Sequence, residues 1–304
     1  MINLKKEINF NKYFKFFNLI SAFLMILSIS LLVFKGLNYG VDFKGGTIIE
    51  LRTVDKNIDI SILRNSFLNM DLGDVSIKKF GNDNDFLVKF EKKNDQKNTF
   101  VSDIKDKLKI SIGDNFSFRR VESVGPKVSQ ELLKSGIIAI LLSLSAMLIY
   151  IWLRFEWQFS LGAITALIHD VLITLGFFSI LSLEINLSIV AAVLTIVGYS
   201  MNDTVVIYDR VRENLKKHSS LGINNVTNIS INETLSRTII TSITTLLALL
   251  AIFIFGGEIL KGFSFAMILG VLFGTYSSIY IANPILSYLN VSYSTIVKED
   301  KNKI

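Results

Sequence analysis

The sequence predicts a polytopic α-helical membrane protein with six transmembrane helices and one small α+β domain between the first two. Three observations predict this class. Six apolar stretches with few or no charges are each about 18–22 residues long, enough to cross the roughly 30 Å of hydrocarbon in a bilayer. Basic residues cluster at those ends of the apolar stretches that would lie on one side of the membrane. About 100 residues between the first two stretches carry more than half of the charges.

The composition fits this class and excludes several others. Hydrophobic residues make up 50% of the chain, and the mean hydropathy is +0.47. The net charge of +6 does not indicate nucleic acid, because the basic residues lie at the ends of the apolar stretches. Without cysteine there are no disulfides, and two histidines are too few for a His-rich metal site. No G-x-x-x-x-G-K-[ST] occurs, so we expect no nucleotide site, no metal and no other cofactor.

The first apolar stretch is expected to be a retained helix. Lys15 precedes an uncharged run from Phe16 to Phe34, which is too long for the core of a typical signal peptide and is followed by no A-x-A site. The six expected transmembrane spans are 14–34, 135–153, 160–181, 187–207, 238–256 and 262–283.

The basic residues near the span ends predict the orientation. Thirteen lie at the N-terminus, after spans 2 and 4 and in the tail, whereas the two short loops opposite contain only Lys261. Because basic loops stay in the cytoplasm, we expect both termini there. The expected parts are the N-terminus with helix 1 (1–34), the outer α+β domain (35–134), a five-helix bundle (135–284) and a cytoplasmic tail (285–304).

Residues 35–134 have the pattern of a small soluble domain, with apolar residues alternating as in strands or spaced as in helices. The expected strands are Thr47–Arg52, Val75–Phe80, Phe86–Phe90 and Phe116–Val121, and the expected helices are Ile60–Met70 and Phe100–Ile110. Gly81 to Asn84 is typical of a hairpin turn. The order β-α-β-β-α-β predicts a ferredoxin-like, split βαβ fold.

Two glycine-containing segments flank this domain. The first, Gly40-Val-Asp-Phe-Lys-Gly-Gly46, includes Asp42, and its pair Gly45-Gly46 is more typical of a turn at the start of a domain than of a ligand cradle. The second contains Gly125 and Pro126 and leads back to the membrane.

Asp203 is the strongest candidate functional residue. It lies in the half of span 4 nearer the cytoplasm, where a charged group is costly to insert. Asn202 and Thr204 beside it make a polar cluster. We interpret Asp203 as a carboxylate that takes up and releases a proton, since low-dielectric surroundings favour the neutral acid. The alternative is a polar residue near a helix end that reaches the interface.

Arg237 and the pair His169-Asp170 are the other proton-relay candidates. Arg237 opens span 5, and three threonines follow on its helical face at spacings of four, seven and eight. This pattern indicates either a polar path inside the bundle or a topology anchor whose hydroxyl neighbours bond their own helix. His169 and Asp170, near the middle of span 3, should face the bundle interior or water. They are either a second relay element or a structural pair with a neighbouring helix.

Two further patterns concern contacts between helices. Gly270 and Gly274 form a small-xxx-small pair in span 6, which favours close helix packing. Asp209 and Arg210 follow span 4. They are either part of a solvated helical extension or a link that couples span 4 to its neighbours.

Four motifs in this order resemble the SecD/SecF family, and most closely the smaller partner of that pair. They are Gly40-Val-Asp-Phe-Lys-Gly-Gly46, Ser123-Val-Gly-Pro-Lys-Val128, Gly198-Tyr-Ser-Met-Asn-Asp-Thr204 with Asp209-Arg-Val-Arg-Glu-Asn214, and Leu235-Ser-Arg-Thr238. The resemblance extends over about residues 14–284.

The resemblance implies a multi-pass protein of the bacterial inner membrane, related to the resistance-nodulation-division (RND) transporters, with a periplasmic α+β domain. It implies a SecD-like subunit, the SecYEG channel, YidC, YajC and a translocating polypeptide as partners. The family uses the proton motive force in late protein export, so H⁺ is the expected coupling ion. In the family, the aspartate of the Asn-Asp-Thr motif and the arginine of the Ser-Arg-Thr motif are linked to proton passage. They correspond to Asp203 and Arg237 in this sequence.

Two alternative functions remain open. A proton-driven RND-type exporter of small molecules or lipids usually has twelve spans and larger outer domains. A non-transporting membrane assembly scaffold needs no buried carboxylate. We do not expect an enzyme, because no nucleophile–base set or metal cluster has convincing spacing.

Overall fold

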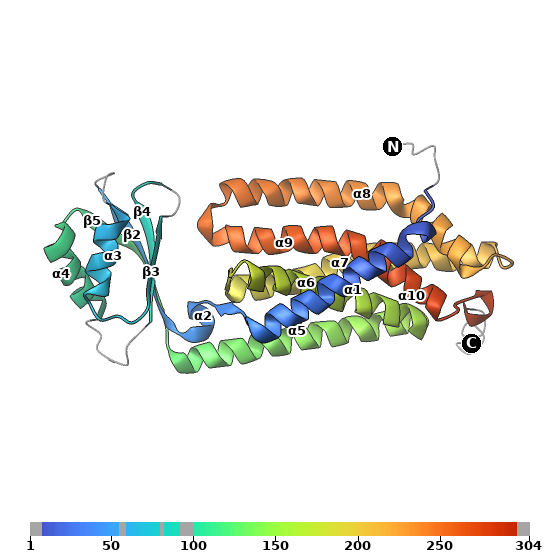
Figure 1. The fold of residues 1–304 in the computed structure, drawn as a ribbon, viewed down its shortest axis with the longest axis horizontal. Helices are drawn as coiled ribbons and strands as arrows, with labels where there is room; N and C mark the ends of the chain where they lie inside the picture. The colour runs from blue at the N-terminus through green and yellow to red at the C-terminus, as the bar shows by residue number, and fades with distance from the viewer. Residues whose placement is uncertain (1–7, 55–58, 80–81, 92–99, 297–304) are drawn as a thin grey trace.

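The computed structural model describes residues 8–54, 59–79, 82–91 and 100–296. It consists of a bundle of long helices with an α+β domain at one end (Figure 1). We call this the domain end of the bundle. The first helix begins and the last helix ends at the opposite, distal end (Figure 1).

Six helical stretches in the described residues are long and apolar enough to cross a membrane, which confirms the predicted class. They are α1 (Asn11–Phe34), α5 (Pro126–Arg154), α6 (Trp157–Ile180), α7 (Leu187–Lys217), α8 (Ile223–Phe255) and Leu260–Tyr288. The last stretch lies within α9 (Gly257–Ser277), the π-helix η1 (Ser278–Ala282) and α10 (Asn283–Tyr288). In the most apolar 18-residue window of each helix, 61% of the residues are buried in α6, but only 11% are buried in α1 and in α5. Helix α6 is therefore central, and α1 and α5 are peripheral.

Three helices extend nine or more residues beyond the apolar spans that the sequence indicates. Helix α5 begins at Pro126 rather than near residue 135, so the end of the predicted outer domain is helical. Helix α7 continues to Lys217, and α8 begins at Ile223 instead of residue 238. Arg237 therefore lies within α8 and does not open it. Hydropathy marks only the part of a helix that suits lipid, whereas the backbone hydrogen bonds continue through polar residues in the absence of proline.

The α+β domain has the predicted ferredoxin-like order. Its elements are β2 (Gly46–Thr53), α3 (Ile60–Leu68), β3 (Val75–Lys79), β4 (Asp85–Phe90), α4 (Phe100–Ile112) and β5 (Phe116–Val124). The strands form an antiparallel sheet in the order β3-β4-β2-β5, with β2 and β4 in the interior. Gly81 of the predicted hairpin lies outside the described residues. Both helices cover the sheet face that points away from the bundle (Figure 1).

Short elements join the two parts. Strand β1 (Asn38–Tyr39) and helix α2 (Val41–Lys44) connect α1 to β2. Strand β6 (Glu184–Ile185) lies in the turn between α6 and α7 and pairs in parallel with β1. The sheet face without helices is directed toward this end of the bundle (Figure 1).

Candidate functional site

Asp203 is a buried carboxylate on α7. The residue is 4% exposed, and its Oδ2 atom is buried without a hydrogen-bond partner in the described part of the chain. Thr204 beside it is also buried and donates to the carbonyl oxygen of Ser200 at 3.2 Å. A buried oxygen without a partner is uncommon and requires an explanation. This oxygen of Asp203 therefore lacks the hydrogen bond that usually holds a buried carboxylate.

Arg237 does not lie inside the bundle. Its side chain is exposed on α8, and no ion pair with Asp203 is found within the described residues. The threonines on its face bond their own helix: Thr241 donates to the carbonyl oxygen of Arg237 at 3.1 Å, and Thr245 donates to that of Thr241 at 2.9 Å. Thr244 is exposed and bonds its own helix as well. These bonds match the second interpretation of the threonine pattern, in which the hydroxyls bond their own helix. Arg237 nevertheless lies close enough for its charge to act on Asp203.

Asp170 is the centre of a fully buried hydrogen-bond network. Its Oδ1 atom lies 2.8 Å from Nδ1 of His169, and its Oδ2 atom accepts from the hydroxyls of Ser200 (2.6 Å) and Ser277 (2.7 Å). His169 and Asp170 are both 0% exposed, so the prediction that they face the interior is confirmed. The network joins α6 to α7 and α9. Sequence reasoning missed both serines, although each lies three residues from a residue it singled out, Asp203 and Gly274.

His169 extends the network toward α1. Adjacent side chains leave a helix about 100° apart, yet His169 turns far enough to contact Asp170. Its ring stacks on Tyr276 with ring centres 5.9 Å apart, and its Nε2 atom is buried without a partner in the described chain. Tyr276 donates to the carbonyl oxygen of Phe17 on α1 at 2.8 Å.

Gly270 and Gly274 make the close helix contact that their spacing predicts. A Cβ atom added at Gly270 would lie 2.6 Å from Cδ1 of Ile196, and one at Gly274 would lie 3.0 Å from Cβ of Ser200. Helix α9 therefore approaches α7 more closely than side chains at these positions would allow. This contact brings Ser277, one turn after Gly274, to the carboxylate of Asp170.

The polar end of α7 is bonded to neighbouring helices. Asp209 pairs with Arg154 of α5 at 3.0 Å, and Arg210 pairs with Glu233 of α8 at 2.7 Å. Of the two interpretations of Asp209 and Arg210, the structure thus favours the link over a merely solvated extension. Arg212 also pairs at 3.0 Å with Glu156, which is 1% exposed and was not singled out from the sequence.

Gly198 and Asn202 lie on the outer face of α7. Both are exposed, and they line a hollow of about 360 Å³ between α5 and α7. The other lining residues are Met147, Tyr150, Met201 and Val205. These two motif residues thus point away from the Asp170 network.

The flanking glycine segments form turns, as expected. Gly45 and Gly46 have φ angles of 83° and 138°, and a Cβ atom at Gly46 would lie 2.6 Å from the carbonyl oxygen of Phe90. Only glycine suits this position. Gly125 precedes α5, and Pro126 is its first residue, where the missing N–H costs no hydrogen bond.

Comparison with known proteins decides the family. The profile described as "Protein export membrane protein SecD/SecF, C-terminal" matches residues 103–292, and the "SecD/SecF GG Motif" matches residues 30–55. The chain belongs to the SecD/SecF family. The first match contains Asp170, Asp203 and Arg237, and the second contains the Gly40–Gly46 segment.

Its relatives include SecF subunits over nearly their whole length. The protein translocase subunit SecF of Rickettsia bellii is 46% identical over 282 residues, covering 92% of this chain and 91% of that protein. The SecF subunit of Cereibacter sphaeroides is 43% identical over 290 residues, covering 92% and 89%. This chain is thus a SecF-type, multi-pass member of the SecD/SecF family.

A solved SecDF structure shares the fold. SecDF from Thermus thermophilus superposes with a TM-score of 0.82 at 36% identity. The superposition covers 95% of this chain but 39% of the SecDF chain. Together with the SecD/SecF family profile, this match supports a SecD-like partner for this protein.

Proposed function

We propose that this SecD/SecF family member, together with its SecD-like subunit, uses the proton motive force to assist late translocation of polypeptides through the SecYEG channel. In this proposal YidC and YajC are further partners and H⁺ is the coupling ion. The domain end lies in the periplasm, and the distal end, with both termini, lies in the cytoplasm of a bacterial inner-membrane protein. The basic residues at the distal end of the bundle support this orientation.

The observation that carries the proposal is the buried, unpartnered oxygen of Asp203. A carboxylate at membrane depth is costly, and those that occur mark ion pathways and proton relays. Asp203 lies on the 31-residue helix α7, and a structural role would require partners that its Oδ2 atom lacks in the described chain.

The structure suggests how protonation would act. Uptake of a proton removes the negative charge of Asp203 and, with it, the attraction to a cation such as Arg237 on the next helix. Ser200, one turn before Asp203 on α7, donates to Asp170 of α6, which also accepts from Ser277 of α9. A rotation of α7 would therefore strain the hydrogen bonds that join these three helices. One charge that crosses 100 mV supplies about 2.3 kcal/mol, enough to bias a two-state packing arrangement. We infer that His169 and Asp170 have a structural role and hold α6, α7 and α9 in fixed positions relative to one another.

Proton-dependent export with an Asp203→Asn variant tests the proposal. In membrane vesicles that carry the SecD-like subunit and the channel, Asp203→Asn should abolish the gradient-dependent part of export without reducing insertion. A protonophore should slow export by the unmodified protein and leave Asp203→Asn unaffected. Asp203→Glu, which keeps a titratable acid, should retain part of the stimulation. Unchanged gradient-driven export in Asp203→Asn contradicts the proton-carrier role and favours a scaffold.

A further inference from the structure

The Gly40–Gly46 segment is bonded to the turn between α6 and α7. Strands β1 and β6 pair in parallel at this point. The backbone N–H of Gly40 donates to the carbonyl oxygen of Ile185 at 2.8 Å, and the side-chain amide of Asn38 donates to that of Ser182 at 3.1 Å. The chain that enters the α+β domain is therefore fixed to the bundle before it reaches the sheet.

Asp42 adds a second cap to the helix that carries Asp203, whose N-cap residue Asn186 accepts from the backbone N–H of Ile189 at 3.1 Å. The Oδ2 atom of Asp42 accepts a hydrogen bond of 2.9 Å from the backbone N–H of Leu187, the first residue of α7. A carboxylate suits this place, because the first N–H groups of a helix lack partners and carry partial positive charge. Phe43 beside it is buried in the apolar cluster that includes Phe178 and Ile189.

The same segment continues directly into an interior strand of the domain. Gly46 is the first residue of β2, which is hydrogen-bonded to β4 on one side and β5 on the other. Gly46 itself pairs with Val124 of β5 and lies close against the carbonyl oxygen of Phe90 in β4, so the turn is held by the sheet on both sides. The connection from α7 to the sheet thus passes through α2 and one glycine turn, without a free linker.

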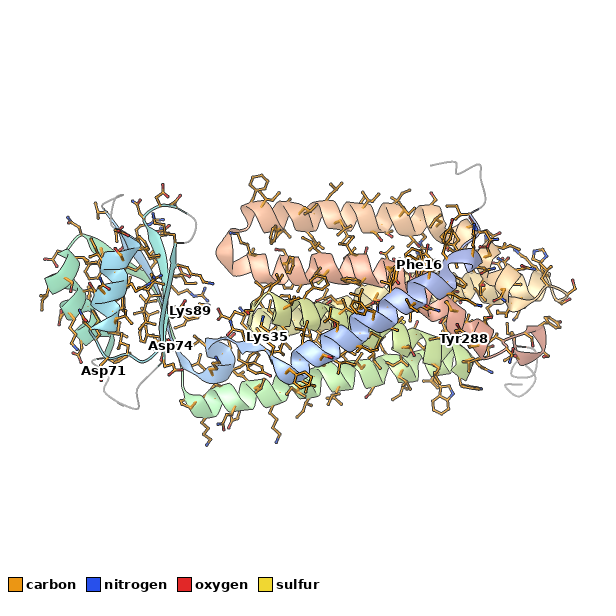
Figure 2. All side chains as sticks on the ribbon, viewed as in Figure 1. Phe16, Lys35, Asp71, Asp74, Lys89 and Tyr288 are labelled. Carbon is orange, nitrogen blue, oxygen red and sulfur yellow. The ribbon has the colours of Figure 1, made fainter. Side chains whose placement is uncertain are left out.

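An ion pair makes a second attachment at the same turn. Lys89 of β4 pairs with Glu184 of β6, and their side chains are 22% and 28% exposed. Figure 2 shows Lys89 projecting from the sheet toward the bundle. Glu184 precedes Ile185, which accepts from Gly40, so both attachments meet at β6.

We propose that Asp42, Lys89 and Glu184 form a rigid mount, through which the α+β domain moves as one body with the domain end of α7. Asp203 follows Leu187 by 16 residues of uninterrupted helix, about 24 Å at 1.5 Å per residue. A displacement of α7 at Asp203 is then delivered to the domain without loss in a hinge. The existence of the mount is inferred from the contacts alone. That a proton-linked displacement of α7 moves the α+β domain through it rests on the proposed function.

A distance measurement tests the mount without relying on export. The chain has no cysteine, so Lys105→Cys on α4 and Leu181→Cys at the end of α6 provide two unique sites for spin labels. In vesicles holding the complex with cysteine-free partner subunits, we expect one narrow distance distribution that a proton gradient does not change. Lys89→Glu should broaden it, and adding Glu184→Lys should narrow it again. Asp42→Ala should broaden it, whereas Asp42→Asn, which keeps a capping oxygen, should not.

Two results of this measurement overturn the mount. One is a broad or gradient-dependent distribution in the chain that carries only the labels. The other is a narrow distribution that persists in both Lys89→Glu and Asp42→Ala. Lys107→Glu, an exposed position on α4 away from the bundle, is the control for the charge change and should leave the distribution unaltered.

A reversible cross-link tests the delivery of movement. Lys89→Cys with Glu184→Cys, joined by a short reductant-cleavable thiol cross-linker, should export at the rate of the unmodified chain. Cleavage should slow its export about two- to five-fold, because the cleaved variant has neither the cross-link nor the ion pair. Uncross-linked Lys89→Glu should export about two- to five-fold more slowly, the effect of losing one partly exposed ion pair. Arrest on cross-linking that reductant reverses overturns the proposal, because the domain must then leave the bundle during transport. If Asp203→Asn exports normally, the proposed function fails while the distance measurement still decides the mount.

Discussion

Replacing Gly270 by alanine should weaken the packing of α9 against α7. The added Cβ would lie 2.6 Å from Cδ1 and 2.9 Å from Cγ2 of Ile196, and closer still to Cγ1. Carbon atoms in contact are about 3.5–4.0 Å apart, so roughly 1 Å of overlap must be relieved. Ile196 is 0% exposed and β-branched, which leaves it little freedom to rotate. Overpacking of this kind costs about 1–3 kcal/mol.

Reversible unfolding by SDS in mixed micelles measures this cost. Gly198→Ala is the matched control, since it makes the same change on α7 where an added Cβ meets no atom within 4 Å in the described chain. It should leave the free energy of unfolding unchanged or raise it by up to about 1 kcal/mol, because alanine has a higher helix propensity than glycine. Ile196→Ala removes the three atoms that lie nearest to the new methyl group. The cost of the double variant should therefore be smaller than the sum of the two single-variant costs by about 0.5–3 kcal/mol.

Either of two results refutes this reasoning. Gly270→Ala as stable as the unmodified chain means that α9 does not approach α7 as closely as described. Additive costs in the Gly270→Ala and Ile196→Ala pair mean that the methyl group meets something other than Ile196. A loss in Gly198→Ala equal to that in Gly270→Ala means that the cost does not arise from the contact of α9 with α7, since helix propensity favours alanine over glycine.

Two further predictions concern buried carboxylates. Asp170→Ala leaves the hydroxyl of Ser200 without its acceptor and that of Ser277 with only the carbonyl oxygen of Gly274, so it should lower the free energy of unfolding by about 1–3 kcal/mol. Asp170→Asn, which keeps one acceptor oxygen, should cost less, and the same SDS titration measures both. In the α+β domain, hydrogen bonds of 2.6 Å from Arg52 hold the pKa of Asp85 below its usual range. This pair stabilises the domain above about pH 4, the unfolded-state value, and the stabilisation is lost as the pH falls through the lower folded-state pKa. Protease resistance of the domain in the full-length chain should therefore fall in acid, and Asp85→Asn should be less resistant at neutral pH and show a flatter acid response.

Local patterns in the sequence were sufficient for the fold class. Long apolar stretches can only be satisfied as membrane helices, and the order of strands and helices in the α+β domain followed from alternation and turn residues. The helix ends were less predictable. Helix α8 begins at Ile223 although Asn, Thr and Ser fill its first turns, because Val226, Ile231 and Leu235 pack into the core, and hydropathy does not register such packing. The close contact of Gly270 and Gly274 was predicted because small residues at this spacing leave room for a neighbouring backbone.

The sequence by itself determined that Asp203, Asp170 and His169 lie where charge is costly, since burial in a membrane span follows from the residues around them. Only the tertiary structure decided their partners. Asp170 accepts from Ser200 and Ser277 on two other helices, and Asp42 caps α7 from 145 positions earlier in the chain. Arg237, in contrast, turned out to face outward. The physical reason is that periodicity fixes which residues share a face of one helix, whereas the rotation and crossing of helices fix which faces meet, and that depends on the fit of the whole bundle.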